Sequence, residues 1–268
     1  MIREITLGQY YQADSLLHKL DPRTKLVGTL TFIISLFLAK NVTAYAVATV
    51  FLVLMIGLSR VPISFIVKGM RAVVMIMMIT VLFNLFLTPG ITAVKIWRFQ
   101  ITYEGIRSAA YMAIRLTYLI LGSSLMTLTT TPNNLTDGME SLMKPLRVFK
   151  VPVHEIAMMM SIALRFIPIL LEETDKIMKA QQARGADFES GGLIKRAKNL
   201  VPLLVPLFVS AFRRANDLAM AMEARCYHGG EGRTKMKPLI YRKRDGAAYA
   251  VLVIYLALIV TAQKLGPL

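Results

Sequence analysis

Long stretches without a charged residue constrain the fold of this chain more than any other feature of its sequence. Residues 26–39 and 41–59 contain no Asp, Glu, Lys or Arg, and only Lys40 separates them. Residues 72–94 are also uncharged, and they are apolar as far as the turn-forming sequence Thr88-Pro89-Gly90. Because a helix needs roughly 20 mostly apolar residues to cross the hydrocarbon core of a bilayer, these runs predict membrane-spanning helices.

Two further runs complete the set of predicted spans. Residues 108–130 are interrupted only by Arg115, and residues 246–263 carry no charge at all. The whole chain is 55% hydrophobic and only 18% charged, whereas a soluble domain has about 25% charged residues. We therefore predict an integral membrane protein with about five transmembrane helices.

The basic residues predict how the chain is oriented. The net charge is +16, and nineteen of the 32 Lys and Arg residues lie between positions 144 and 244. Since basic residues gather on the cytoplasmic side of membrane proteins, this segment and the N-terminus are expected in the cytoplasm. The predicted division is a cytoplasmic N-terminal segment (1–25), four transmembrane helices (26–130), a cytoplasmic helical coupling domain (131–245), and a final transmembrane helix with a short tail (246–268). Residues 1–25 are too polar for a cleaved signal peptide.

The predicted cytoplasmic segment is patterned as helices. Caps and breakers place a short helix up to residue 144, a long helix over 153–183 and another over 193–225. Both long helices have an apolar half, residues 156–171 and 200–212, which suits helices that are buried on every side or that touch lipid. The fold class is therefore an all-α integral membrane protein with long crossed coupling helices, whose apolar halves cross and whose polar tips reach into the cytoplasm.

Charged pairs occur at matching positions of the two long helices. Glu172 and Glu173 lie on the first helix, and Arg213 and Arg214 lie on the second. Opposite charges at equal depth suit ion pairs between crossed helices. Solvated charges on separate faces explain the same pattern, so both interpretations stay open.

Each long helix ends in an arginine preceded by alanine. The sequences are Gln182-Ala183-Arg184-Gly185 and Glu223-Ala224-Arg225-Cys226. An arginine in the last turn suits the helix dipole, so a simple helix end is one interpretation. The other is a docking tip: small neighbours leave room to enter a groove, and the guanidinium offers a planar fork to carboxylates.

These motifs resemble those of a known family over essentially the full chain. The sequence His18-Lys-Leu-Asp-Pro-Arg-Thr-Lys25 is similar to the opening motif of the transmembrane T component of energy-coupling factor (ECF) vitamin and micronutrient transporters. The two Ala-Arg-small sequences resemble that family's coupling motifs, and Cys226-Tyr227-His228-Gly229-Gly230 continues the second match. Read without the family, Asp21-Pro22 predicts a helix cap.

The resemblance implies partners and a cell-membrane location. In this family the arginine-bearing helix ends dock on two cytoplasmic ABC-type ATPases, which assigns docking to the residues Ala183, Arg184, Gly185, Ala224, Arg225 and Cys226. The apolar parts of the same helices carry an S component that binds the substrate, and in the family's shared modules this S component is exchangeable. Met158, Met159 and Met160 are candidates for that contact, because methionine adapts to several partners, although core filling explains them equally well.

The chain shows no motif for chemistry of its own. A P-loop, zinc-ligand spacing and a GxSxG sequence are all lacking, so we expect no catalysis, no metal and no cofactor. Membrane orientation and contact with the lipid bilayer account for the basic excess, so nucleic acid is not an expected partner. The alternative function is a self-sufficient permease or channel with a cytoplasmic regulatory domain.

Overall fold

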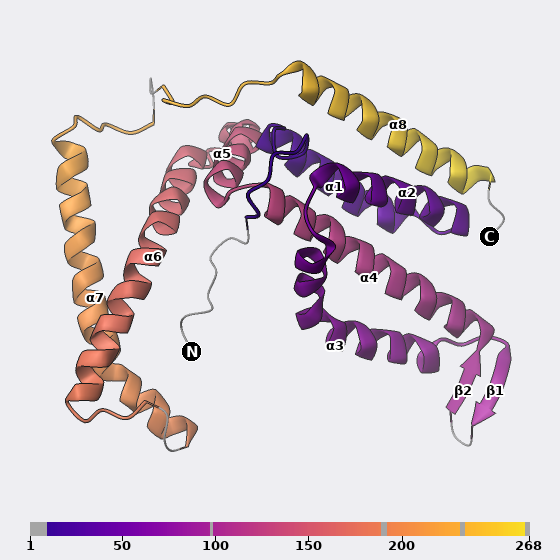
Figure 1. Ribbon diagram of the computed structural model, residues 1–268, viewed down its shortest axis with the longest axis horizontal. Helices are drawn as coiled ribbons and strands as arrows, with labels where there is room; N and C mark the ends of the chain where they lie inside the picture. The colour runs from indigo at the N-terminus through magenta and orange to yellow at the C-terminus, as the bar shows by residue number, and fades with distance from the viewer. Residues whose placement is uncertain (1–9, 97–98, 189–191, 231–233, 266–268) are drawn as a thin grey trace. The chain divides into compact units, whose positions relative to one another are not determined.

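The computed structural model describes residues 10–96, 99–188, 192–230 and 234–265, and most of these residues are helical (Figure 1). The elements are α1 (Pro22–Leu38), α2 (Val42–Ser59), α3 (Ile63–Leu87), β1 (Thr92–Ile96), β2 (Phe99–Thr102), α4 (Tyr103–Thr129), α5 (Pro132–Met143), the 3₁₀-helix η2 (Lys144–Phe149), α6 (Val153–Ala183), α7 (Leu193–Glu223) and α8 (Lys243–Leu265). The predicted all-α fold class is confirmed apart from one short hairpin.

The chain forms two compact units. The first, called the bundle here, contains the described residues of 8–141 and 239–268, and so joins α1–α5 to the last helix, α8. The second, called the α6–α7 unit, contains residues 142–238. The long helix predicted over 153–183 is α6, and the helix predicted over 193–225 is α7, which ends two residues earlier.

Local sequence signals explain where several bundle helices begin. Asp21 is the N-cap of α1 and accepts a hydrogen bond from the backbone N–H of Arg23, while Pro22 occupies the first helical position. This confirms the cap predicted from Asp21-Pro22. Thr102 caps α4 in the same way, because its hydroxyl accepts a hydrogen bond from the Gly105 N–H at 3.0 Å.

The core of the bundle lies where α8 packs against α1 and α2. Tyr255 of α8 is 3% exposed and stacks on Phe51 of α2 with 4.1 Å between ring centroids. Its hydroxyl lies 2.7 Å from Ser35 Oγ of α1, so the buried polar group is satisfied. The last helix is therefore part of the same hydrophobic core as the first two.

An antiparallel hairpin, β1–β2, joins α3 to α4 and was not predicted. Its register pairs Ile96 with Phe99 and Thr92 with Thr102. We expected the chain to turn at Thr88-Pro89-Gly90, and α3 does end just before, at Leu87. The residues that follow, Thr-Ala-Val-Lys-Ile and Phe-Gln-Ile-Thr, are rich in the β-branched and aromatic types that favour strands.

Within the part of the chain that the structure describes, four helices are long and apolar enough to cross a membrane, by length and composition, compared with about five predicted spans. They are α2, α4, α6 and the Lys243–Lys264 part of α8. Three of them, α2, α4 and α8, coincide with predicted spans. The helix α1 has 17 residues and the apolar stretch Val73–Leu87 of α3 is also short of a full crossing. The helix α6 satisfies the criterion through its apolar first half, although the charge distribution predicts it in the cytoplasm.

Arg115 does not stand alone in α4. Its Nε donates to the Tyr45 hydroxyl at 3.0 Å, and its Nη2 lies 3.4 Å from the Ala39 carbonyl oxygen. The guanidinium therefore ties α4 to the connection between α1 and α2, where it satisfies a carbonyl at a helix end.

Candidate functional site

The helices α6 and α7 cross each other in the last third of α6 (Figure 1), and a polar cluster joins them there. Glu173 of α6 accepts two hydrogen bonds from Arg214 of α7, at 2.7 Å from Nη2 and 3.2 Å from Nε. Ser210, one turn before Arg214, donates to the other carboxylate oxygen. Of the four charged residues predicted to pair, the structure brings together Glu173 and Arg214. Glu172 and Arg213 are exposed.

This cluster fixes how the two helices cross. The Arg214 and Glu173 side chains are 40% and 23% exposed, so water screens the pair only in part. Both Arg214 N–H groups donate to Glu173 Oε2 and the Ser210 hydroxyl donates to Oε1, so each carboxylate oxygen has a donor on α7. A second contact, from Gln181 Nε2 to the Pro202 carbonyl oxygen at 3.5 Å, lies further along. Later residues of α6 thus meet earlier residues of α7, so the two helices run in opposite directions past each other.

The two Ala-Arg sequences adopt the same backbone structure. At the end of α6, the Gly185 N–H donates to the Gln182 carbonyl and the Ala186 N–H donates to the Gln181 carbonyl. At the end of α7, Cys226 and Tyr227 donate to Glu223 and Met222 in the same pattern. This pair of bonds defines a Schellman helix end, in which the residue after the cap has positive φ. Gly185 has φ 89° and Cys226 has φ 56°.

The Schellman geometry gives a backbone reason for the residue that follows each arginine. Glycine adopts positive φ without penalty, whereas cysteine does so with some strain. The sequence alone suggested that these residues are small in order to leave room for docking. The structure shows that Gly185 also serves to end its helix.

Neither arginine is explained by contacts within the chain. Arg184 and Arg225 are exposed, as are Ala183, Ala224 and Cys226. Among the residues that the structure describes, neither guanidinium has a hydrogen bond or an ion pair. The two helix ends lie at opposite ends of the α6–α7 unit (Figure 1). The unit therefore presents two separate cationic tips to solvent.

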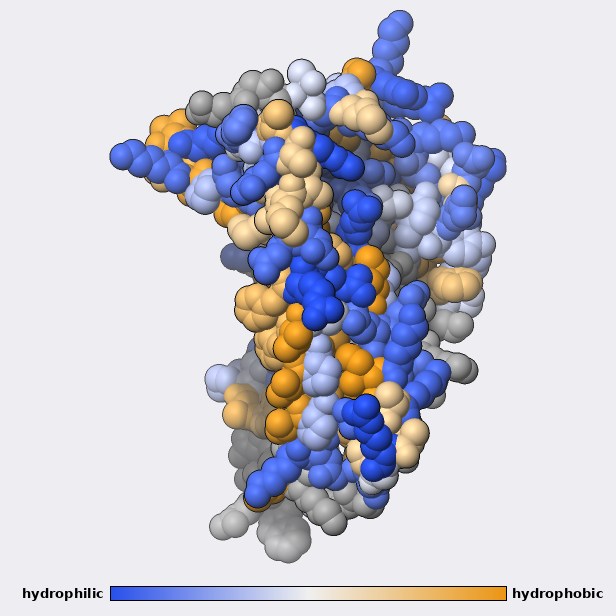
Figure 2. All heavy atoms as spheres, turned by 90° about the vertical axis from the view of Figure 1, so that its left-hand side faces the viewer, coloured by the Kyte–Doolittle hydropathy of each residue, from blue (hydrophilic) through white to orange (hydrophobic). Residues whose placement is uncertain are grey.

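An exposed apolar stripe follows one face of α7. Its members are spaced by three or four residues, as one helix face requires, and they are 44–68% exposed: Val201, Leu204, Val205, Phe208, Val209 and Phe212. Figure 2, which faces this unit, shows hydrophobic side chains gathered in the middle and hydrophilic ones around them. On α6, Met159 is 58% and Met160 is 38% exposed, while Met158 is half-buried. Such a surface is too apolar to be left in water.

A polar network in the bundle surrounds the start of α1. Asp245, 2% exposed, accepts hydrogen bonds from the Asp21 N–H at 2.8 Å and the Thr24 hydroxyl at 3.2 Å. Its other oxygen accepts from the Arg242 N–H at 2.8 Å. Asp21 in turn binds the Arg23 guanidinium through both carboxylate oxygens. These bonds hold the start of α8 against the start of α1, more than 200 residues earlier in the chain.

Neighbouring residues extend this network to the preceding segment and to α4. Lys25 Nζ donates to the Thr129 carbonyl at 2.8 Å, which ties α1 to the end of α4. His18 bonds Ser15 and the Tyr11 carbonyl. Burial lowers the pKa of His18, and the Lys25 charge lowers it further, against the Tyr11 hydrogen bond, so the imidazole is neutral at pH 7. The charged motif of residues 18–25 thus helps to hold the bundle together at this point.

Little in the sequence indicates this network. Asp245 looked only like the residue that precedes the last span, and Thr24 had no assigned role. The one available signal is an acidic residue directly after Arg242-Lys243-Arg244, at the border of an apolar run. Burial there demands a hydrogen-bonded partner.

Comparisons with known proteins agree on one family. The family model for CbiQ, described as a cobalt transport protein, matches residues 13–236. The protein named energy-coupling factor transporter transmembrane protein EcfT in Clostridium kluyveri is 55% identical over 247 residues, which cover 91% of this chain and 92% of that protein. The proteins of the same name in Thermosediminibacter oceani and Bacillus subtilis are 54% and 49% identical, over 92% and 97% of this chain and 94% and 98% of theirs.

Proposed function

The chain belongs to the CbiQ family, as a transmembrane component of the ECF transporter type, and from this premise we propose that it couples two ATPases to a substrate-binding subunit. Arg184 and Arg225 dock on two cytoplasmic ABC-type ATPase subunits. The apolar surface of α6 and α7 carries an S component, and the assembly imports a vitamin or another micronutrient across the cell membrane. The N-terminus and the α6–α7 unit are cytoplasmic.

The observation that carries this proposal is the pair of exposed guanidiniums on identical helix ends. The fold needs a positive φ after each arginine, and any cation in the last turn would suit the helix dipole. The fold does not need arginine at both helix ends. A planar guanidinium binds a carboxylate bidentately and loses less water than an ammonium, so it is suited to a protein groove.

The α6–α7 unit has the mechanical properties that coupling requires. Each helix has 31 residues, and the Glu173–Arg214–Ser210 cluster holds the two together where they cross. When ATP binding brings the ATPases together, both tips are displaced. The crossing point transmits this displacement to the apolar stripe, and the S component that rests there reorients. The ATPases hydrolyse ATP, and this chain contributes no catalytic group.

The apolar surface supports a protein partner for α6 and α7. Six large apolar side chains along one face of α7 are exposed, as are Met159 and Met160 on α6, and a membrane subunit or lipid must cover them. Methionine adapts to differently shaped partners. Exchangeable S components are therefore compatible with this surface.

The test replaces both docking arginines in the assembled transporter. The double variant Arg184→Ala, Arg225→Ala should lose ATPase binding and ATP-dependent uptake, by at least about 30-fold in affinity for each desolvated anchor removed. Arg213→Ala is the matched control, because Arg213 is an exposed arginine on α7 without a partner among the described residues.

A conservative variant separates docking from helix termination. Replacing both arginines by lysine keeps the charge at the helix ends, so stability should not change, but the planar fork is lost and ATPase binding should weaken. Full assembly and uptake in the double alanine variant would contradict the docking role. Transport by the purified chain alone in liposomes would instead favour a self-sufficient permease.

A further inference from the structure

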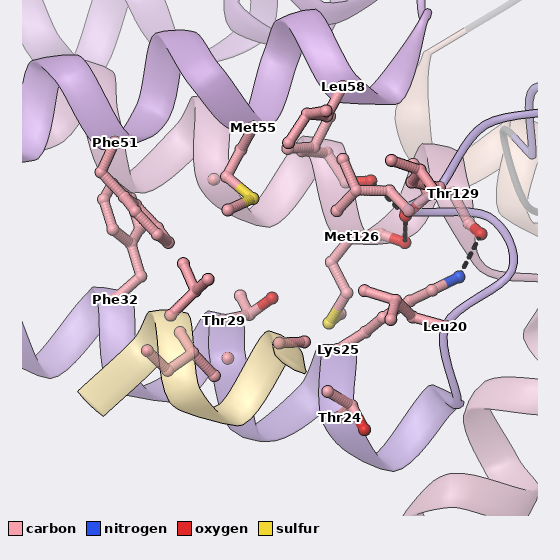
Figure 3. Close-up of a pocket in the computed structure, with 18 of the residues that line it drawn as sticks. Leu20, Thr24, Lys25, Thr29, Phe32, Phe51, Met55, Leu58, Met126 and Thr129 are labelled. Carbon is pink, nitrogen blue, oxygen red and sulfur yellow. Dashed lines mark hydrogen bonds between the residues drawn. The ribbon is translucent and has the colours of Figure 1, made fainter. Parts of the chain in front are cut away.

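A cavity of about 370 Å³ lies inside the bundle, between α1, α2, α4 and α8. Figure 3 shows Phe32 and Phe51 at one end, Met55 and Met126 between the helices, and Leu20 at the other end near the Lys25 amine. Protein interiors rarely contain voids much larger than one water molecule, which has a share of roughly 30 Å³. Because this cavity also opens at the surface of the bundle, a molecule from outside the chain can fill it.

The lining excludes water as that occupant. It is almost entirely carbon, and three of its few polar side chains are engaged with other parts of the protein. Thr24 donates to Asp245, Lys25 donates to the Thr129 carbonyl, and the Thr129 hydroxyl donates to the Leu125 carbonyl. A buried water molecule needs two to four polar partners, and apolar cavities stay dry.

The cavity opens where its lining residues are themselves exposed. Leu16 is 57% exposed, Leu58 is 44% and Val251 is 45%. The α2 and α8 residues belong to helices that are apolar enough to span a bilayer. The opening therefore faces the acyl chains of the bilayer.

One charged group at the opening has no protein partner. Arg244 lines the cavity and is exposed, and among the described residues its guanidinium makes no hydrogen bond or ion pair. Arg242 and Lys243 precede it in the chain, whereas the adjacent acid, Asp245, is buried and accepts three hydrogen bonds. The charge at the opening is therefore cationic, and it favours a head group with a net negative charge over a zwitterionic one, whose phosphate is balanced by its own cation.

We infer that the cavity binds one acyl chain of an anionic phospholipid, whose phosphate is bound by Arg244. Gly28 and the small residues Ala247 and Ala248 create the space, since the lining has no side chain at Gly28 and only methyl groups at the two alanines. A Cβ at Gly28 would lie 3.4 Å from the Leu252 side chain, which is ordinary contact. A larger side chain at position 28 therefore enters the cavity without backbone strain.

The test uses the full chain in nanodiscs that contain phosphatidylglycerol or phosphatidylcholine with a diazirine at the end of one acyl chain. After photolysis, mass spectrometry maps the label to peptides of α1 and α8. The expected result is about fivefold more label from phosphatidylglycerol, the preference that one basic residue confers at an anionic head group.

Two pairs of variants separate the acyl chain from the head group. Gly28→Leu should abolish labelling by both lipids, whereas Gly57→Leu should not, because Gly57 is exposed on α2 with no atom within 4 Å of its Cβ position. Arg244→Gln should remove the preference for phosphatidylglycerol. Lys243→Gln, the same charge change beside the cavity, should retain it.

Three results would each overturn the inference. Gly28→Leu and Gly57→Leu could be labelled equally, or Arg244→Gln and Lys243→Gln could show the same preference for phosphatidylglycerol. The third is label found only on residues outside the cavity. If circular dichroism shows that Gly28→Leu is unfolded, Thr29→Leu replaces it, because the Thr29 side chain lines the same cavity and makes no hydrogen bond among the described residues.

Discussion

Removal of the Asp245 carboxylate should release the start of α8 from the start of α1. The carboxylate is 2% exposed and accepts hydrogen bonds from the Asp21 N–H, the Thr24 hydroxyl and the Arg242 N–H. In Asp245→Ala, the Thr24 hydroxyl can rotate to another acceptor, and the Arg242 N–H lies near the surface, where water replaces the lost bond. The Asp21 N–H is buried and has no such substitute.

The expected loss follows from that remaining group. A hydrogen bond to a charged group contributes about 1.5–3 kcal/mol, and a buried donor left without an acceptor costs about 1–3 kcal/mol. Relief from burying the carboxylate offsets part of this. Asp245→Ala should therefore lower the free energy of unfolding by about 2–4 kcal/mol. Asp245→Asn keeps one acceptor but turns an amide N–H toward a backbone N–H, so its loss should be smaller.

The measurement is unfolding of the purified chain by SDS in mild detergent, followed by far-ultraviolet circular dichroism. Asp14→Ala is the matched control, because the Asp14 side chain is 91% exposed and, among the described residues, pairs with Lys19 alone. The expected order of destabilisation is Asp245→Ala, then Asp245→Asn, then Asp14→Ala. If Asp245→Ala unfolds within about 0.5 kcal/mol of Asp14→Ala, which is the usual effect of a surface substitution, the network does not hold the two helices together.

Three further predictions concern the helix ends, the crossing and pH. Cys226→Gly should raise stability by up to about 1 kcal/mol, because glycine removes the strain of positive φ that Gly185 avoids in the other tip. A double-mutant cycle of Glu173→Gln and Arg214→Gln should give a coupling of up to about 1 kcal/mol, since the pair is partly exposed. Burial opposes ionisation of Asp21, but the Arg23 hydrogen bonds outweigh it and lower the pKa. The unfolded state then takes up protons first, so this contribution to stability is complete above about pH 4 and is lost at lower pH.

Each of these predictions can be contradicted by the same unfolding assay. No gain in Cys226→Gly, with a loss in Cys226→Val, would mean that the thiol has a role beyond its backbone conformation. A cycle that sums to zero would remove Glu173–Arg214 as a brace between α6 and α7. An acid transition unchanged by Asp21→Asn would assign the loss of stability to other carboxylates.

The sequence predicted the features that depend on local pattern. The ends of α6 agree with prediction, because Pro152 and Gly185 mark both boundaries. The cap at Asp21 follows from its neighbour Pro22. Hydropathy located α2, α4 and α8 because an uncharged run of spanning length leaves few alternatives. The hairpin β1–β2 was missed, since a short apolar run does not distinguish a strand from the end of a helix.

The sequence does not indicate which residues far apart in the chain come into contact. Asp245 and Asp21 are joined by a hydrogen bond across 224 positions, and no local pattern of either residue indicates the other. The charged residues on α6 and α7 could be predicted in part. Their matching positions along the two helices follow from the sequence, but adjacent residues of a helix are about 100° apart around its axis. Only the rotation of each helix decides that Glu173, and not Glu172, faces Arg214.

The two Ala-Arg tips show how a structural and a functional interpretation apply to different residues of one motif. Helix termination accounts for Gly185, which adopts the required positive φ freely. Cys226 occupies the same position of the second motif with some backbone strain. The helix dipole stabilises any cation in the last turn by about 0.3–1 kcal/mol. Identical backbone hydrogen bonds place both arginines at the same step of the same motif. The helix end alone does not require arginine at both positions, since neither guanidinium makes a hydrogen bond or an ion pair with another described residue. The proposed docking on two ATPase subunits would account for an arginine at each.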